Sequence, residues 1–245
     1  MLLIRSLLFA LCQMLSLSIF GSLSLLTFPL PFHVRYRTIT LWTHFNLWCL
    51  AKICNITYEA EGLENIPVRN GIILCKHQSA WETMALQQLF PPQVWVLKRE
   101  LLWLPLLGWG LAMLDPIAID RKAGRRALQQ IVEQGTQRLN TGRWVVIFPE
   151  GTRIVPGMRG RYAPGGAILA ERSGYPVVPV AHNAGEFWPR NSFIKHPGVI
   201  RIVIGPVIES AGKDAAEINA LAEAWIEGKM REIEALKAAH TQARA

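Results

Sequence analysis

The sequence has little cysteine and no cysteine pairs. The 245 residues contain four cysteines, and none shows the close paired spacing of a structural zinc site. We interpret them as small buried apolar side chains in a reducing compartment. Internal repeats and low-complexity tracts are also missing, and the length suits one globular domain plus an appendage. The four residues are Cys12, Cys49, Cys54 and Cys75.

Acidic residues are scarce relative to basic ones. The 26 Lys and Arg outnumber the 18 Asp and Glu, which gives a formal net charge of +8 and an isoelectric point of about 9.6. This balance indicates anionic partners. Hydrophobic residues make up 51% of the chain and the mean hydropathy is +0.21, which argues against a simple nucleic-acid-binding protein. We therefore expect membrane lipids as partners, and no nucleic acid.

Charge is absent from residues 6–32, which follow Arg5. This run is long enough to cross a bilayer at about 20 residues per span. A cleaved signal peptide is disfavoured because the run is too long and lacks an Ala-x-Ala site. A second apolar segment, residues 38–56, contains Trp42, Trp48 and Lys52 and suits an interfacial or re-entrant helix as well as a span.

These features predict the domain organisation and location. Residues 1–57 are expected to form a hydrophobic membrane anchor of one or two helices, and residues 58–245 the globular domain. The positive charges of Arg35, Arg37 and Lys52 exceed that of Arg5, which favours the cytoplasmic side of the inner membrane for this domain. Two helices embedded in one leaflet are equally compatible with the sequence.

Short apolar runs alternate with amphipathic ones downstream of residue 58. This alternation predicts an α/β fold in which a mostly parallel sheet is flanked by helices. The expected strands are residues 71–75, 93–97, 116–119, 143–148, 176–180 and 199–204, and the expected helices are residues 80–90, 122–140 and 214–239, the last capped by Asp214.

Two polar motifs follow predicted core strands. Residues 76–82 read Lys-His-Gln-Ser-Ala-Trp-Glu, and residues 148–153 read Phe-Pro-Glu-Gly-Thr-Arg. The strand ends of an open α/β sheet are where ligands usually bind. His77 and Glu82 lie five residues apart, with the acid entering a helix, so they can form a general base and its orienting partner.

Other hydrolytic chemistries lack their motifs here. A zinc hydrolase needs further ligands near His77, and the sequence has no His-Glu-x-x-His pattern. A serine hydrolase needs Gly-x-Ser-x-Gly, which is absent, and Ser79 stands in a different context. Neither a metal nor another cofactor is expected.

The motifs, in this order, resemble those of the 1-acyl-sn-glycerol-3-phosphate acyltransferase (lysophosphatidic acid acyltransferase, PlsC-like) family. The likeness covers roughly residues 60–210 and includes three further segments, residues 98–101, 119–121 and 177–180. It implies the glycerolipid acyltransferase fold. One departure is Glu82, because the first motif of the family normally ends in Asp.

The resemblance and the side-chain chemistry together assign roles. His77 is expected to remove the proton of a lipid hydroxyl, and Glu82 to hold the imidazole and stabilise the imidazolium. Arg153 has a planar fork suited to phosphate, and by resemblance it binds the acceptor phosphate together with Lys98 and Arg121. The segment Glu150, Gly151 and Thr152 is expected to brace the loop or to face the acyl donor, with Gly151 offering an N–H to the oxyanion. A simple left-handed turn also explains Gly151.

The expected activity is transfer of an acyl group from acyl-CoA or acyl-carrier protein to the sn-2 hydroxyl of 1-acyl-sn-glycerol-3-phosphate (lysophosphatidate), which gives phosphatidic acid. Two alternatives stay open: an acyltransferase for another lysolipid, and a non-catalytic lipid-binding protein of the same fold, to which Glu82 gives the only support. The acyl donor, the chain length and the oligomeric state are not fixed by the sequence.

Overall fold

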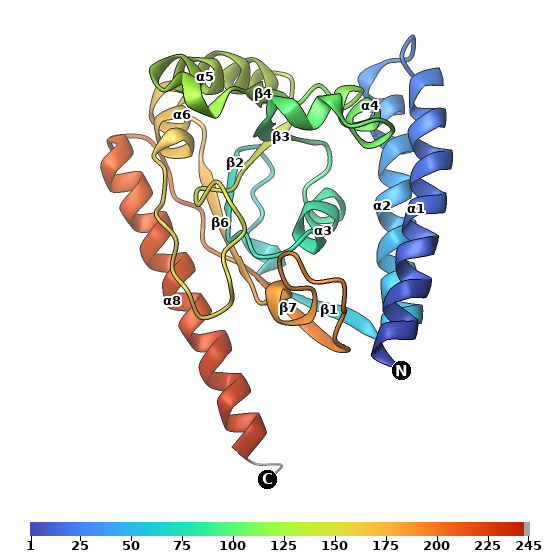
Figure 1. Cartoon of the computed structure of the whole chain (residues 1–245). Coiled ribbons are helices and arrows are strands. Elements are labelled where there is room, and N and C mark those ends of the chain that lie inside the picture. Colours follow the sequence, from blue (N-terminus) through green and yellow to red (C-terminus); the bar gives the residue numbers. More distant parts are fainter. Residues whose placement is uncertain (243–245) are drawn as a thin grey trace.

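The computed structural model describes residues 1–242 and contains one seven-stranded sheet in the order β1-β7-β6-β2-β5-β3-β4 (Figure 1). All neighbouring strands are parallel except β6 and β7, which pair antiparallel. This confirms the expected mostly parallel sheet. The strands are β1 Ile56–Glu61, β2 Ile72–Cys75, β3 Gln93–Lys98, β4 Ile117–Ile119, β5 Trp144–Ile147, β6 Val177–His182 and β7 Gly198–Ile204.

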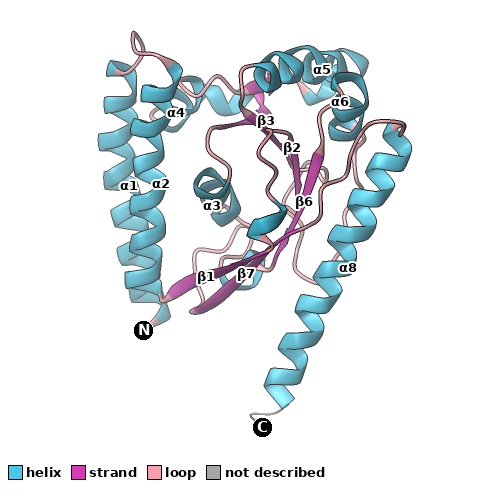
Figure 2. Ribbon diagram, turned by 180° about the vertical axis from the view of Figure 1, so that it is seen from behind, coloured by secondary structure: helices cyan, strands magenta, loops and turns pink. Residues whose placement is uncertain are grey.

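Helices cover both faces of the sheet (Figures 1 and 2). Helices α1, α2 and α3 pack on one face, and α5, α6 and α8 on the other. The central strand β2 is buried on both faces, with Ile73 in the first hydrophobic core and Ile72 in the second, which explains its unbroken apolar sequence. The helices are α1 Leu2–Leu26, α2 Phe32–Cys54, α3 Trp81–Leu89, α4 Leu107–Ala112, α5 Arg125–Asn140, α6 Gly165–Ser173, α7 Ala184–Phe187 and α8 Ala215–Gln242.

The elements differ from the sequence expectation in several places, and helices α4, α6 and α7 were not expected. Helix α5 begins at Arg125 rather than Lys122, because a short 3-10 turn ends at Gly124, which has a positive φ of 50°. Strand β1 was not expected. It lies at the edge of the sheet, and after Ile56 its exposed residues alternate with half-buried ones. It starts at Ile56, so the expected boundary after residue 57 lies inside this strand. The cap of α8 is confirmed, as Asp214 accepts the Glu217 N–H at 2.8 Å.

The two N-terminal helices belong to the same hydrophobic core as the sheet. Phe9 of α1 and Leu50 of α2 have no exposed surface. The Phe9 ring meets Trp188 edge-on at 5.5 Å, and α2 packs on α3. The N-terminal segment, which was expected to act as an anchor, also forms one wall of the domain.

Candidate active site

The first polar motif forms a histidine–carboxylate pair at the start of α3. Nδ1 of His77 lies 2.8 Å from Oε1 of Glu82. The imidazole stacks on the Phe148 ring with centroids 4.1 Å apart, and its side chain keeps 15% of its surface exposed. No described residue contacts Nε2 of His77 by a hydrogen bond. The expected contact between His77 and Glu82 is therefore present, and it involves Nδ1 of the imidazole.

Glu82 is completely buried, yet its carboxylate oxygens accept several hydrogen bonds from the protein. From the first turn of α3 it accepts the backbone N–H groups of Gln78 at 3.0 Å and Ser79 at 2.9 Å, which lie just before the helix. Burial alone would raise the pKa of Glu82. The neighbouring His182, the contact with His77 and the Ser79 N–H outweigh burial and hold this pKa below its usual value. Glu82 is thus an anion that can orient His77.

A second histidine, His182, lies behind the pair and was missed at the sequence level. Its Nε2 donates to the Lys76 carbonyl at 2.8 Å and lies 3.8 Å from Oε2 of Glu82, while its Nδ1 accepts the Ala184 N–H at 3.2 Å. Burial lowers the pKa of His182, and both of its ring nitrogens are hydrogen-bonded to backbone groups beside Glu82. The motif segment at residues 177–180 ended two residues short of it.

The second motif forms a turn directly beside His77. Gly151 has a left-handed φ of 65°, and its N–H donates to the Phe148 carbonyl at 3.0 Å. The expected role of this N–H toward an oxyanion stays a prediction, and in the structure the N–H closes the turn. Arg121 donates to the Gly151 carbonyl, which ties the two predicted phosphate-binding segments together. Thr152 is exposed on the outside of the turn.

Glu150 connects the two motifs, in line with the bracing role expected of it. Its Oε2 accepts the His77 N–H at 3.0 Å, and its Oε1 accepts from Nζ of Lys76 at 2.7 Å. The Ile154 N–H also donates to the His77 carbonyl at 2.7 Å. The loop after β5 therefore fixes the position of the His77 backbone.

His77 and the three expected phosphate ligands line one cavity of about 470 Å³. Lys98 comes from the end of β3, Arg121 from the turn after β4 and Arg153 from the loop after β5. Neighbouring parallel strands bring these distant residues to one edge of the sheet. Lys98 keeps 49% of its side chain exposed and pairs with Glu100 at 3.3 Å. Among residues 1–242, no group of three or more His, Cys, Asp or Glu is placed to hold a metal.

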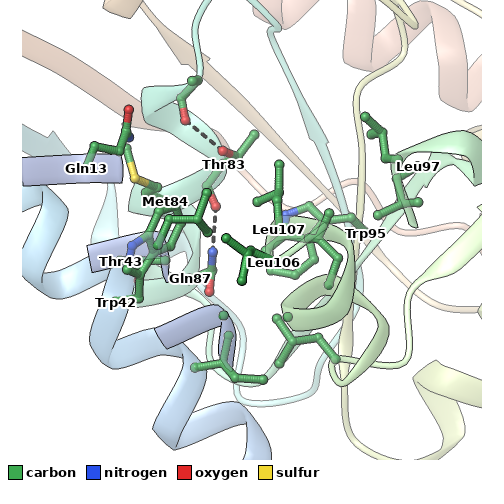
Figure 3. A pocket seen from close by; sticks show the side chains of 18 of the residues that line it. Gln13, Trp42, Thr43, Thr83, Met84, Gln87, Trp95, Leu97, Leu106 and Leu107 are labelled. Atoms are coloured by element: carbon green, nitrogen blue, oxygen red, sulfur yellow. Dashed lines mark hydrogen bonds between the residues drawn. The ribbon is translucent and has the colours of Figure 1, made fainter. Parts of the chain in front are cut away.

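The rest of the cavity is lined mostly by apolar side chains, with a few uncharged polar ones among them (Figure 3). Side chains converge on it from α1, α2, α3, β3 and the start of α4. The N-terminal helices thus contribute directly to the site, which the sequence did not indicate. The labelled lining residues are Gln13, Trp42, Thr43, Thr83, Met84, Gln87, Trp95, Leu97, Leu106 and Leu107.

Comparison with known proteins agrees with this arrangement. The family model described as Acyltransferase matches residues 57–183. A 1-acyl-sn-glycerol-3-phosphate acyltransferase of Pseudomonas aeruginosa is 48% identical over 235 residues, covering 94% of this chain and 91% of the relative. A protein of the same name from Cocos nucifera is 26% identical over 211 residues, or 85% and 68% of the two chains.

The fold also matches a solved structure. The crystal structure of the 1-acyl-sn-glycerophosphate acyltransferase PlsC from Thermotoga maritima superposes with a TM-score of 0.78, at 22% identity and over 96% of both chains. This likeness supports the fold, while the Pseudomonas relative and the family model carry the assignment. The chain belongs to the 1-acyl-sn-glycerol-3-phosphate acyltransferase family.

Proposed function

We propose that the protein transfers a fatty acyl group from acyl-CoA or acyl-carrier protein to the sn-2 hydroxyl of 1-acyl-sn-glycerol-3-phosphate, giving phosphatidic acid. One observation carries this proposal: His77 and three cations line a cavity whose remaining wall is mostly apolar. A lysophosphatidate has a phosphate monoester, a free hydroxyl and an acyl chain, which match these three features. The name of the Pseudomonas relative supports the same substrate.

In the proposed mechanism, Nε2 of His77 accepts the proton of the acceptor hydroxyl while its oxygen attacks the carbonyl carbon of the donor thioester. The C–S bond of the resulting tetrahedral intermediate then breaks, and the leaving thiolate takes the proton from the imidazolium. Glu82 stabilises the imidazolium between these steps through the 2.8 Å contact with Nδ1. No covalent acyl-enzyme is needed, because the substrate hydroxyl takes the place of a serine.

The cations have a separate task in this scheme. Arg121 and Arg153 provide forked donors for the phosphate oxygens, and Lys98 adds a mobile point charge. A dianionic phosphate monoester suits three cations better than the zwitterionic head group of other lysolipids does. The contact between His77 and Glu82 counts against the non-catalytic alternative, since a protein without catalysis has no use for an oriented base.

We further propose that the protein is bound to the membrane by α1 and α2 lying in one leaflet. Helix α1 is long and apolar enough to cross a bilayer. The mean hydropathy of its most apolar 18 residues is 1.9, and only 17% of that stretch is buried. It contacts the domain near both ends, at Ser6, which accepts the Lys195 N–H, and at Gly21, which abuts Leu106. The two contacts are about 22 Å apart along the helix. If α1 crossed the bilayer, it would therefore carry the attached domain into the bilayer.

The apolar surface supports this orientation. Trp103 and Trp109 are exposed in the segment beside α1, as interfacial aromatic residues are. The proposed location is the cytoplasmic side of the inner membrane, with residues 1–55 as an anchor that also lines the site. Exposed apolar side chains on α1 include Leu3, Ile4, Leu7, Leu8, Leu11, Leu15 and Ile19.

The test is an acyl-transfer assay with purified protein in detergent. Acyl-CoA and acyl-carrier protein are offered in turn with lysophosphatidate, lysophosphatidylethanolamine or lysophosphatidylcholine. We expect phosphatidic acid to form at least about tenfold faster than the other products, and His77→Ala to lower that rate by about 10²- to 10⁴-fold. Equal rates with all three acceptors would refute the assigned substrate, and an active His77→Ala protein would refute the mechanism.

A further inference from the structure

A buried ion cluster connects the C-terminal helix α8 to the backbone of His77. Its centre is Lys76, the residue before His77, which is only 1% exposed. The ammonium donates to Oε1 of Glu150 at 2.7 Å, to Oε1 of Glu227 at 2.8 Å and to the Met158 carbonyl at 3.3 Å. Its three N–H donors therefore have three acceptors, as burial of a charge requires.

Glu227 is the member of the cluster that comes from far away in the chain. It lies on α8, beyond the residues 57–183 that the family model matches. Its Oε1 also accepts the Tyr162 hydroxyl at 2.9 Å, in a site that is nearly closed to solvent. Helix α8 packs against α6 and β6, and its glutamate reaches the residue adjoining the candidate base.

Glu150 completes the connection to the site. One of its oxygens binds Lys76, while the other accepts the His77 N–H at 3.0 Å. The Lys76 ammonium thus lies between the carboxylate that holds the His77 backbone and the carboxylate of α8. Two carboxylates share one cation, so each fixes the position of the other through it.

We propose that Glu227 is a positioning residue, which sets the place of His77 through Lys76 and Glu150 and thereby makes α8 part of the catalytic apparatus. This inference rests on the proposed function for its kinetic consequence, but its structural consequence is independent of any substrate. Loss of the Glu227 charge lets Lys76 and Glu150 rearrange, and the His77 backbone moves with them. Small misplacements of catalytic groups reduce turnover strongly.

The decisive variant is Glu227→Gln, which keeps the size and a hydrogen-bonding oxygen but removes the charge. Glu223→Gln is the matched control, because Glu223 lies one turn earlier on α8 and pairs with Arg159 at the surface. We expect kcat to fall about tenfold in Glu227→Gln, with both KM values within about twofold of the parent. Glu223→Gln should match the parent in all three constants.

A second measurement separates this proposal from the proposed function. The full chain in detergent is labelled with ¹⁵N-histidine, and the His77 amide signal is identified by its absence from His77→Ala. We expect that signal to shift in Glu227→Gln and to stay in place in Glu223→Gln, whether or not lysophosphatidate proves to be the substrate. An unmoved His77 signal in Glu227→Gln would overturn the positioning role, even if the variant were less active.

Tyr162→Phe provides a milder perturbation should Glu227→Gln not fold. This variant removes only the hydroxyl that donates to Glu227, so the ion cluster keeps all of its charges. We expect a smaller shift of the His77 signal in the same spectra and a fall in kcat of about threefold. An unchanged signal and unchanged kcat in this variant would likewise overturn the proposal.

Discussion

Replacement of Glu82 by Gln tests the most unusual feature of the site. The carboxylate has no exposed surface. It contacts Nδ1 of His77 and accepts hydrogen bonds from the backbone N–H groups of Gln78 and Ser79. An amide can place only one oxygen toward these donors, and it turns an NH₂ group toward the remaining ones. It also offers no charge to stabilise an imidazolium. The change therefore affects the orientation and the charge of the pair at once.

The size of the effect follows from the geometry. A lost carboxylate partner of a catalytic histidine costs about 10²- to 10⁴-fold in kcat, which corresponds to roughly 3 to 5 kcal/mol of transition-state stabilisation. Glu82→Asp keeps the charge but is shorter by one C–C bond of about 1.5 Å. The 2.8 Å contact with His77 must then lengthen or the start of α3 must shift, so we expect a loss nearer tenfold.

The assay compares initial rates of both variants with the parent at saturating acceptor and donor. Glu59→Gln is the matched control, because Glu59 is an exposed carboxylate on the edge strand β1. Thermal unfolding of each protein in the same detergent accounts for changes in folded fraction. If Glu82→Gln turns over as fast as the parent, Glu82 only stabilises the start of α3, and another group must orient His77.

Three further outcomes are expected. Arg153→Lys should raise the KM for lysophosphatidate about tenfold and leave the donor KM within twofold, because the charge remains while the fork is lost; equal changes in both constants would show a structural role. Phe9→Ala should lower the free energy of unfolding by about 3–5 kcal/mol because its ring is fully buried, whereas Leu8→Ala, at a 52% exposed position, should change it little; equal unfolding midpoints would contradict the shared core. His182 and Glu82 both have lowered pKa values in the folded protein, so the unfolded chain binds protons more readily. The free energy of unfolding should therefore decline as pH falls below about 6.5. In urea titrations, a His182→Gln protein should show a flatter decline between about pH 6.5 and 5.

Local sequence determined six of the seven strands and the two motifs. The runs that became β2 and β5 are apolar throughout, because a strand covered on both faces needs no polar side. Five residues separate His77 from Glu82, and a turn followed by the first residues of α3 spans that distance. The pairing of base and acid is therefore a local property, and the sequence predicted it.

The long-range contacts depended on the tertiary structure. His182 and Glu227 reach the site from β6 and α8, and neither stands in a motif, because nothing in their neighbouring residues distinguishes a buried partner from a surface side chain. In the turn around Gly151, the Gly151 N–H donates to the Phe148 carbonyl. Only the path of the backbone decides which of its groups stay free.

The sequence by itself determined that an apolar N-terminal segment precedes an α/β domain with a histidine, a carboxylate and three cations at its strand ends. The tertiary structure decided that His77 and the three cations line one cavity, with Glu82 buried behind His77, and that α1 and α2 form a wall of the same cavity. The physical reason is that the hydrophobicity of a helix predicts that the helix will be buried, but not which surface it will pack against. Which surface an apolar helix covers is set by the packing of the whole chain, and here that surface includes the site.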